Sequence, residues 1–141
     1  MTTAALGFEA KLTAPYDQAI DIVTTALKTE GFGVLTRIDI HAAFKEKLGI
    51  EFRPYSILGA CNPALAYRAL TRDAEAGLML PCNVTVEAEE TGTMVRIADP
   101  EVMLSVGGMG QDPALHAVAT EARLRLTRVV ESLRAHPAAA C

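Results

Sequence analysis

Alternating apolar and polar positions predict most of the strands of this chain. Over 6–13 every second residue is apolar, which is the period of a strand with one buried face. The stretch from Tyr55 to Cys61 is apolar at both parities, which is typical of a central strand or one covered on both faces. A Glu90-Thr91-Gly92 turn joins two further alternating stretches into a hairpin. The predicted strands are 6–13, 33–38, 55–61, 82–89 and 93–98.

Helices are predicted where apolar residues recur with a helical period between capping residues. Pro15 suits a first turn, and Gly31 stands just past the end of the helix that follows. Asp39 can cap a short helix through Leu48. Asn62-Pro63 and Asp112-Pro113 each combine an N-cap with proline at the first helical position. The last helix keeps one apolar face, formed by Leu115, Val118, Ala119, Ala122, Leu126, Val129, Val130 and Leu133.

The order of these elements, β-α-β-α-β-α-β-β-α, predicts an α+β fold. We expect a two-layer sandwich, with a mixed sheet of about five strands and the helices mainly on one face. The whole chain, 1–141, is expected to form a single domain, with a mobile glycine loop at 107–110 and a frayed tail at 137–141. Since such a sheet leaves one face uncovered, we also expect a homodimer.

Composition narrows the classes of function. Of the 141 residues, half are hydrophobic and only 5% are aromatic, so the chain should fold around a core of small and aliphatic side chains. A formal net charge of −4 argues against a nucleic-acid binder. The N-terminal residues show no secretory signal, and no apolar run reaches the ~18 residues of a membrane helix, so we expect no membrane partner and a cytoplasmic location. Three cysteines do not suggest a disulfide framework.

Two matching steps, Cys61-Asn62 and Cys82-Asn83, are the most distinctive chemical feature. Cys61 ends a strand where a helix begins, so it faces free backbone N–H groups and the positive end of a helix dipole. That setting lowers a thiol pKa, which would make Cys61 a reactive thiolate; the alternative is a small buried apolar residue. Cys82 begins a strand on the same face as Val84 and Val86, where packing is the natural interpretation.

Whether the two thiols share a site depends on the relative direction of their strands. Parallel strands would place Cys61 and Cys82 ~20 Å apart, at opposite ends of the sheet, whereas antiparallel strands would place them at the same end. The long return after the third helix allows the antiparallel arrangement, which we favour. Paired thiolates suit Zn(II) or Cu(I), and no histidine has ligand spacing. The candidate completing groups are Met79, Met103 and Asp99, and the candidate ligand-binding residues are Asn62 and Asp99.

Basic residues give weaker indications of function. Arg37, Arg53 and Arg68 could line a cleft for an anionic ligand, although ordinary surface arginine is the simpler interpretation. The arginines near the C-terminus alternate with glutamates, which is typical of a solvated helix face. The glycine loop at 107–110 lacks the Lys-Ser/Thr pair of a phosphate loop.

Several short motifs occur in an order that resembles a known family. They are Gly31–Thr36, Phe52–Tyr55, Leu58–Pro63, Leu80–Val84 and Asp99-Pro100. Over about 8–133 the chain resembles the uncharacterised bacterial and archaeal family catalogued as domain of unknown function 302. The resemblance implies a small two-layer α+β domain, commonly seen as a dimer, without an established activity. Other branches of the family look like Gly-Asn-Pro at 61–63 and carry no Cys at the position of Cys82, so the thiols mark a subgroup.

Three hypotheses of function follow. The first is a cytoplasmic binding protein in which Cys61 and Cys82 hold a metal ion, Zn or Cu, or a small sulfur-containing or anionic ligand. The second is a thiol-dependent enzyme of sulfur or redox metabolism with Cys61 as its catalytic nucleophile. The third is a dimerisation module without a ligand.

Overall fold

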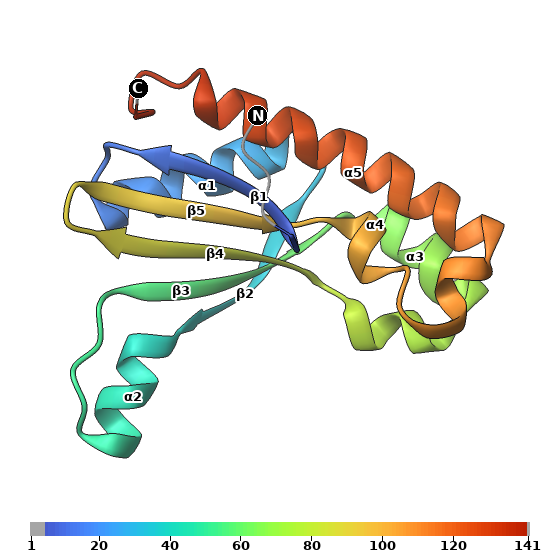
Figure 1. Ribbon diagram of the computed structural model, residues 1–141, viewed down its shortest axis with the longest axis horizontal. Helices are drawn as coiled ribbons and strands as arrows, with labels where there is room; N and C mark the ends of the chain where they lie inside the picture. Colours follow the sequence, from blue (N-terminus) through green and yellow to red (C-terminus); the bar gives the residue numbers. More distant parts are fainter. Residues whose placement is uncertain (1–4, 141) are drawn as a thin grey trace.

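Five strands form one sheet in the computed structural model, which describes residues 5–140 (Figure 1). The strands are β1 (Gly7–Leu12), β2 (Gly33–Asp39), β3 (Tyr55–Cys61), β4 (Cys82–Glu89) and β5 (Gly92–Ala98). Their order across the sheet is β1-β5-β4-β3-β2, and every neighbouring pair is antiparallel. The α+β class and the two layers are confirmed, but the sheet is antiparallel throughout rather than mixed.

The connections explain why no neighbouring strands run parallel. A parallel neighbour requires a crossover that returns the chain to the end where the first strand began. Here α2 (Ile40–Leu48) and α3 (Pro63–Arg72) lie beyond opposite ends of β3, so the chain turns back directly into the next strand (Figure 1). The helix α1 (Tyr16–Thr29) crosses the sheet and carries the chain from one edge strand, β1, to the other, β2.

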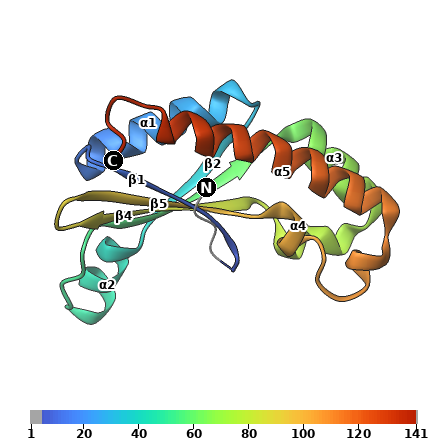
Figure 2. The same cartoon turned by 45° about the horizontal axis from the view of Figure 1, so that its top comes forward.

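Two helices cover one face of the sheet and enclose the core. α1 and the long C-terminal α5 (Pro113–Arg134) lie side by side on that face (Figure 2). The eight residues predicted as the apolar face of α5 are the eight that are buried there, so this prediction is confirmed. Alternate strand residues meet them from the sheet, among them Phe8, Val84 and Val86, each no more than 2% exposed. The apolar face of the helix and the inward-facing residues of the strands therefore pack into one core.

Short helical segments gather beyond the end of the sheet at which β3 stops. They are α3, the 3₁₀ helix η1 (Ala74–Met79), α4 (Pro100–Met103) and the 3₁₀ helix η2 (Gly107–Gln111). The glycine-rich segment predicted as a mobile loop is η2, and its Met109 is buried. Its glycines permit a tight turn, while the methionine between them anchors the segment to the core.

At the opposite end of the sheet α2 projects from the body of the protein (Figure 1). None of its nine residues is buried. Leu48 and Ile50 are 65% and 54% exposed, and Phe44 and Phe52 form an edge-to-face pair with centroids 5.2 Å apart. The surface formed by Phe44, Leu48, Ile50 and Phe52 is called the arm surface below.

The C-terminal tail, which we expected to fray, pairs with the first strand as far as the structure describes it. Thr13 N–H donates to Ala138 O at 2.6 Å, and Ala140 N–H donates to Lys11 O at 2.9 Å. These bonds satisfy part of the exposed edge of β1. Cys141, the last residue of the predicted frayed segment, lies outside the described residues.

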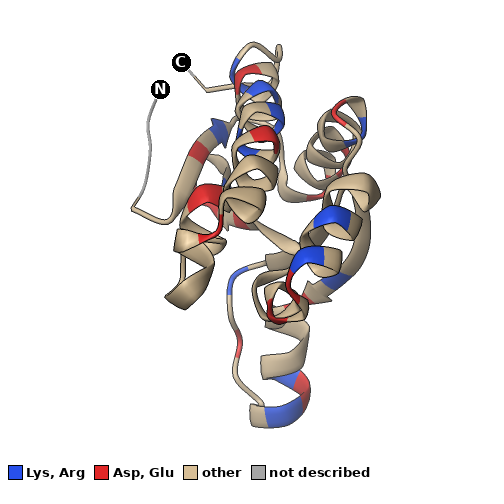
Figure 3. Ribbon diagram, turned by 90° about the vertical axis from the view of Figure 1, so that its right-hand side faces the viewer, with Lys and Arg blue, Asp and Glu red and all other residues tan. Residues whose placement is uncertain are grey.

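Basic and acidic residues are interspersed along the helices and strands (Figure 3). On α5, Arg123 pairs with Asp99, Arg125 with Glu121 and Arg128 with Glu30 across to α1. These three arginines are thus part of a solvated ion-pair face, as predicted. Among residues 5–140, no helix is long and apolar enough to cross a membrane.

Candidate functional site

The two cysteines lie at the same end of the sheet, on neighbouring strands. β3 and β4 are antiparallel, and Cys82 pairs with Ala60, the residue before Cys61. The sequence left both strand directions open, and the structure has the one that brings the two cysteines to the same end of the sheet. Because Cys82 pairs with Ala60 and side chains alternate along a strand, the two thiols leave the sheet on opposite faces. Cys61 is half-buried and Cys82 is 9% exposed, and both are free thiols.

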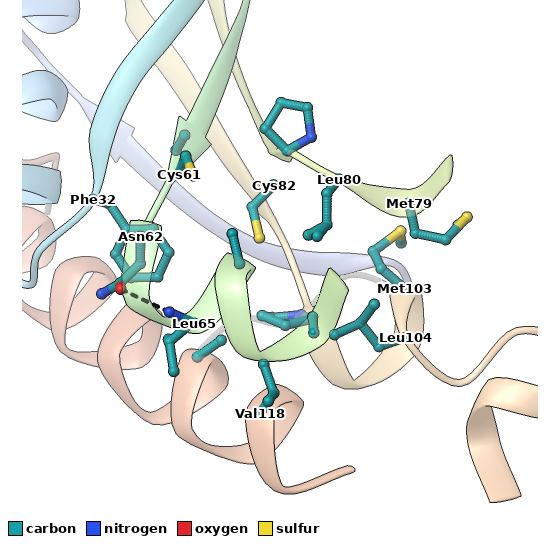
Figure 4. A pocket seen from close by; sticks show the side chains of 16 residues that line it. Phe32, Cys61, Asn62, Leu65, Met79, Leu80, Cys82, Met103, Leu104 and Val118 are labelled. Carbon is teal, nitrogen blue, oxygen red and sulfur yellow. Dashed lines mark hydrogen bonds between the residues drawn. The ribbon is translucent and has the colours of Figure 1, made fainter. Parts of the chain in front are cut away.

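A small cavity lies between this end of the sheet and the helices beyond it. Its volume is about 40 Å³, which gives room for roughly three water-sized groups. Both cysteines and both methionines proposed as completing groups, Met79 and Met103, line it. The remaining lining is apolar apart from Asn62, and it includes Phe32, Leu65 and Val118 (Figure 4). Half of the eight sulfur-bearing residues of the chain therefore line one small cavity.

Distant parts of the sequence supply the four sulfur atoms. Cys61 comes from the end of β3, Cys82 from the start of β4, Met79 from the end of η1 and Met103 from the end of α4. The side chain of Cys82 points into the cavity toward α3, with Cys61 on one side of it and Met103 and Met79 on the other (Figure 4). The sulfurs surround the cavity rather than converge on a single point.

Asn62 holds the start of α3 in place beside the cavity. Its Oδ1 accepts a hydrogen bond from Leu65 N–H at 3.2 Å, and its Nδ2 donates to Glu30 O at 3.5 Å. The first bond is the N-cap that the Asn-Pro step predicts. A side chain at Gly31, whose φ is +82°, would come within 2.9 Å of Nδ2, so glycine leaves room for this arrangement. The amide of Asn62 is therefore used to join α3 to the end of α1.

Burial raises the pKa of both thiols. The effect is strongest at Cys82, where burial and the nearby Cys61 raise the pKa to about 11. The pKa of Cys61 is also raised by burial, although sequence reasoning expected the helix start to lower it. Desolvation is the cause at Cys61, because burial disfavours the charged thiolate. Both groups are therefore thiols at neutral pH.

Asp99 does not line the cavity, although it was a candidate for metal and ligand binding. Its carboxylate caps α4 by accepting from Glu101 N–H at 2.9 Å, and it pairs with Arg123 at 3.1 Å. Pro100, the next residue, does line the cavity. Asp99 thus positions one wall of the cavity and contributes no ligand to it.

The described residues contain no group of three or more His, Cys, Asp and Glu that could hold a metal ion. His116 and His136 are exposed, whereas His41 is half-buried and accepts from Tyr55 N–H at 3.0 Å. The arginines considered for an anionic cleft lie apart from the cavity, each beside a carboxylate. Arg37 pairs with Asp39, Arg53 with Glu87 and Arg68 with Glu121.

A buried polar cluster near α2 was missed by sequence reasoning. Ser56, which is fully buried, donates to Asp39 Oδ1 at 2.6 Å and accepts from the Tyr16 hydroxyl. Arg37 donates to the same oxygen of Asp39 at 2.8 Å. Hydrogen bonds from Ser56 and Arg37 lower the pKa of Asp39. The sequence does contain a signal for this cluster, because Ser56 is a polar residue at an inward-facing position of an otherwise apolar strand.

The family is now identifiable. The model described as "Domain of unknown function DUF302" matches residues 8–133. The chain belongs to the DUF302 family. A crystal structure of an uncharacterised conserved DUF302 protein from Bacillus stearothermophilus is similar, with 31% sequence identity and a TM-score of 0.81. The match covers 93% of this chain and all of that one. No curated protein matches. The resemblance and the residue range predicted for it, about 8–133, are confirmed. Membership of the DUF302 family assigns no activity, so the argument for a function depends on the cavity.

Proposed function

We propose that this DUF302 protein binds a soft metal ion in the cavity, with the sulfurs of Cys61 and Cys82 as ligands. The observation that supports the proposal is the placement of two thiols and two thioethers around one small space. Sulfur ligands prefer soft or borderline ions such as Cu(I) and Zn(II). A purely structural role would require only that these positions be small and apolar.

The size and charge of the cavity favour an ion over the other ligands considered. A volume of about 40 Å³ accommodates a few atoms, which is far below the roughly 300–1,000 Å³ of typical small-molecule sites. An anionic ligand finds no support, since no Lys, Arg or His is found among the described residues of the lining. A sulfur-containing metabolite of ordinary size would require the surrounding helices to move apart.

The alternative of a thiol-dependent enzyme has less support. The thiolate is the nucleophile in such enzymes, and its pKa is usually lowered by a cation or by a metal. Here burial raises the pKa of Cys61 and Cys82, and no described cationic side chain lines the cavity. With a pKa of about 11, Cys82 is ionised to about one part in a thousand at pH 8.

Metal retention measured together with thiol protection tests the proposal. A Cys141→Ser variant leaves Cys61 and Cys82 as the remaining thiols. We expect it to retain about one equivalent of Zn(II), Cd(II) or Cu(I) after gel filtration, with slower alkylation of both thiols by iodoacetamide. Changing either cysteine to alanine should abolish retention. A chain that binds none of these ions, and whose alkylation rates do not change, would refute the proposal.

For the partner, we propose that a second copy of the chain covers the arm surface. A helix of nine residues is too short to be stable alone, so its apolar side needs a partner. A two-fold dimer places the same patch on both subunits, and the mixed charges beside it, such as the Lys45–Glu51 pair at 3.2 Å, suit self-pairing. Sedimentation should give a dimer that Leu48→Glu dissociates. A native chain that stays monomeric at high concentration would exclude it.

A further inference from the structure

We infer that two copies of the chain pair through the outer edges of their β2 strands, antiparallel and with Ile38 on the two-fold axis. This pairing rests on the proposed arm-surface dimer and names a second surface of the same interface. Three features of the described residues favour it: an uncovered edge of the sheet, the charges along that edge and the position of α2.

The two edges of the sheet differ in how they are covered. At the β1 edge the C-terminal tail hydrogen-bonds to Lys11 and Thr13. At the other edge β2 pairs, within the described residues, with β3 alone (Figure 1). Four consecutive residues of β2, 35–38, are exposed, and Leu35 and Ile38 are 68% and 50% exposed. An uncovered edge with apolar side chains is a template for pairing with another strand.

The charges along this edge select one register for a two-fold pair. In an antiparallel pair centred on Ile38, Arg37 of each copy lies opposite Asp39 of the other copy. Opposite charges that face each other across strands are stabilising, and the two-fold axis makes this contact occur twice. A pair centred on Arg37 would instead place that cation opposite its own copy. A pair centred earlier on the strand would include the irregular step between Val34 and Thr36.

Arg37 and Asp39 remain open to a second partner. Their side chains are 43% and 37% exposed, although Arg37 Nε donates to Asp39 Oδ1 at 2.8 Å within the chain. A guanidinium group has five donors, and a carboxylate has about four acceptor positions. Each group can therefore keep its internal hydrogen bond and also form one with the other copy.

Ile38 gives the same register an apolar centre. Leu58 on β3 faces the core, so its neighbour Ile57 points to the opposite face of the sheet. Ile38 pairs with Ile57 and lies on that face too. On the two-fold axis the two Ile38 side chains meet, and with Ile57 of each copy they form one apolar row across four strands.

The position of α2 joins the strand pair to the arm surface. A few residues of paired strand are too small an interface alone, since stable interfaces bury about 1,200–2,000 Å². α2 begins at Ile40, directly after β2 and two residues beyond the axis (Figure 1). In the paired dimer Ile40 lies opposite Thr36 of the other copy, so the arm starts beside the other copy's strand. One two-fold axis can therefore bury both surfaces.

A disulfide on the axis tests the register. In Ile38→Cys, made in the Cys141→Ser chain, the two introduced thiols face each other with Cα atoms about 4.5–5.5 Å apart, which a disulfide spans. We expect diamide, which takes up the two thiol hydrogens, to convert most of the chain to a covalent dimer in non-reducing electrophoresis. Leu35→Cys is the matched control: it is more exposed but three residues from the axis, so its thiols lie ~20 Å apart and should not cross-link.

Reversing one charge gives a second measurement that needs no cross-link. Arg37→Glu places a carboxylate opposite Asp39 at both symmetric positions and should raise the dimer dissociation constant at least about tenfold in sedimentation. Arg68→Glu is the matched control, because Arg68 also belongs to a surface ion pair, with Glu121, but lies on α3 away from β2. It should leave the dissociation constant unchanged. Circular dichroism of each variant confirms that a lost dimer is not lost folding.

The outcomes separate this pairing from the arm-surface proposal. A dimer that Leu48→Glu dissociates, but in which Ile38→Cys does not cross-link, would overturn the β2 pairing and leave the arm surface as the contact. Cross-linking of Leu35→Cys in preference to Ile38→Cys would overturn the register and with it the inference. Cross-linking of Ile38→Cys that Leu48→Glu leaves unchanged would support the β2 pairing and remove the arm surface. A native chain that stays monomeric would exclude both.

Discussion

Replacing Gly59 by alanine should destabilise the part of the sheet that carries the two cysteines. Gly59 lies on β3, two residues before Cys61. A Cβ there would press against Thr36 Oγ1 and lie 2.8 Å from Pro81 Cγ, a separation that real Cβ atoms essentially never show. The proline ring precedes β4 and is rigid, so the strands must shift. Overpacking of this kind typically lowers the free energy of unfolding by about 1–3 kcal/mol.

Gly33→Ala is the matched control for this prediction. Gly33 lies on the neighbouring strand and pairs with Cys61, yet a Cβ there meets no atom within 4 Å. Alanine should stabilise that position by about 0.4–1 kcal/mol, because it restricts the unfolded chain. The two variants should therefore differ by about 1.4–4 kcal/mol in urea unfolding followed by circular dichroism. Removing the hydroxyl with Thr36→Ala should reduce the effect of Gly59→Ala. Equal stabilities of the two glycine variants would refute the reasoning.

Two further predictions concern polar groups that position the fold. Asn62→Ala removes the cap of α3 and should lower the free energy of unfolding by about 0.5–2 kcal/mol, whereas Asn62→Asp, which retains the capping oxygen, should lose less. The bond from Ser56 lowers the folded-state pKa of Asp39, so its stabilisation is present above the unfolded pKa and is lost as pH falls through the folded value. Below about pH 4 the native chain should therefore lose more stability than Asp39→Asn in acid titrations followed by circular dichroism.

Local sequence signals predicted most of the elements because those signals act within a few residues. The Asn-Pro and Asp-Pro steps start α3 and α5 where expected, and both caps form. The limits of β3 and β4 are also those predicted. Local signals did not predict the relative direction of β3 and β4, because a return of about ten residues can lead to either end of the sheet. Packing of α3 and η1 beyond the sheet decides it.

The environment of the thiols depends on contacts that no local pattern contains. A helix start considered alone predicts a lowered pKa for Cys61. Burial raises it instead, and the cavity beside Cys61 is lined partly by residues of η1 and α4 that lie far from it in the sequence. Met103 was named among the completing groups, but only the β5-α4 connection brings it to the lining of the cavity. Asp99 was named for the same reason and is instead held by Arg123.

Burial has opposite consequences for the two kinds of thiol chemistry considered for this cavity. A nucleophilic thiolate must exist before its substrate arrives, so the desolvation that raises the pKa of Cys82 to about 11 acts fully against it. A metal ion instead replaces the proton and brings its own positive charge, which removes most of that penalty. A small ion also enters a space that excludes larger reagents. Slow alkylation of Cys61 and Cys82 in the metal-free chain would therefore count against the enzyme while leaving the metal site intact, which is tested by metal retention and by the further slowing of alkylation that a bound ion causes.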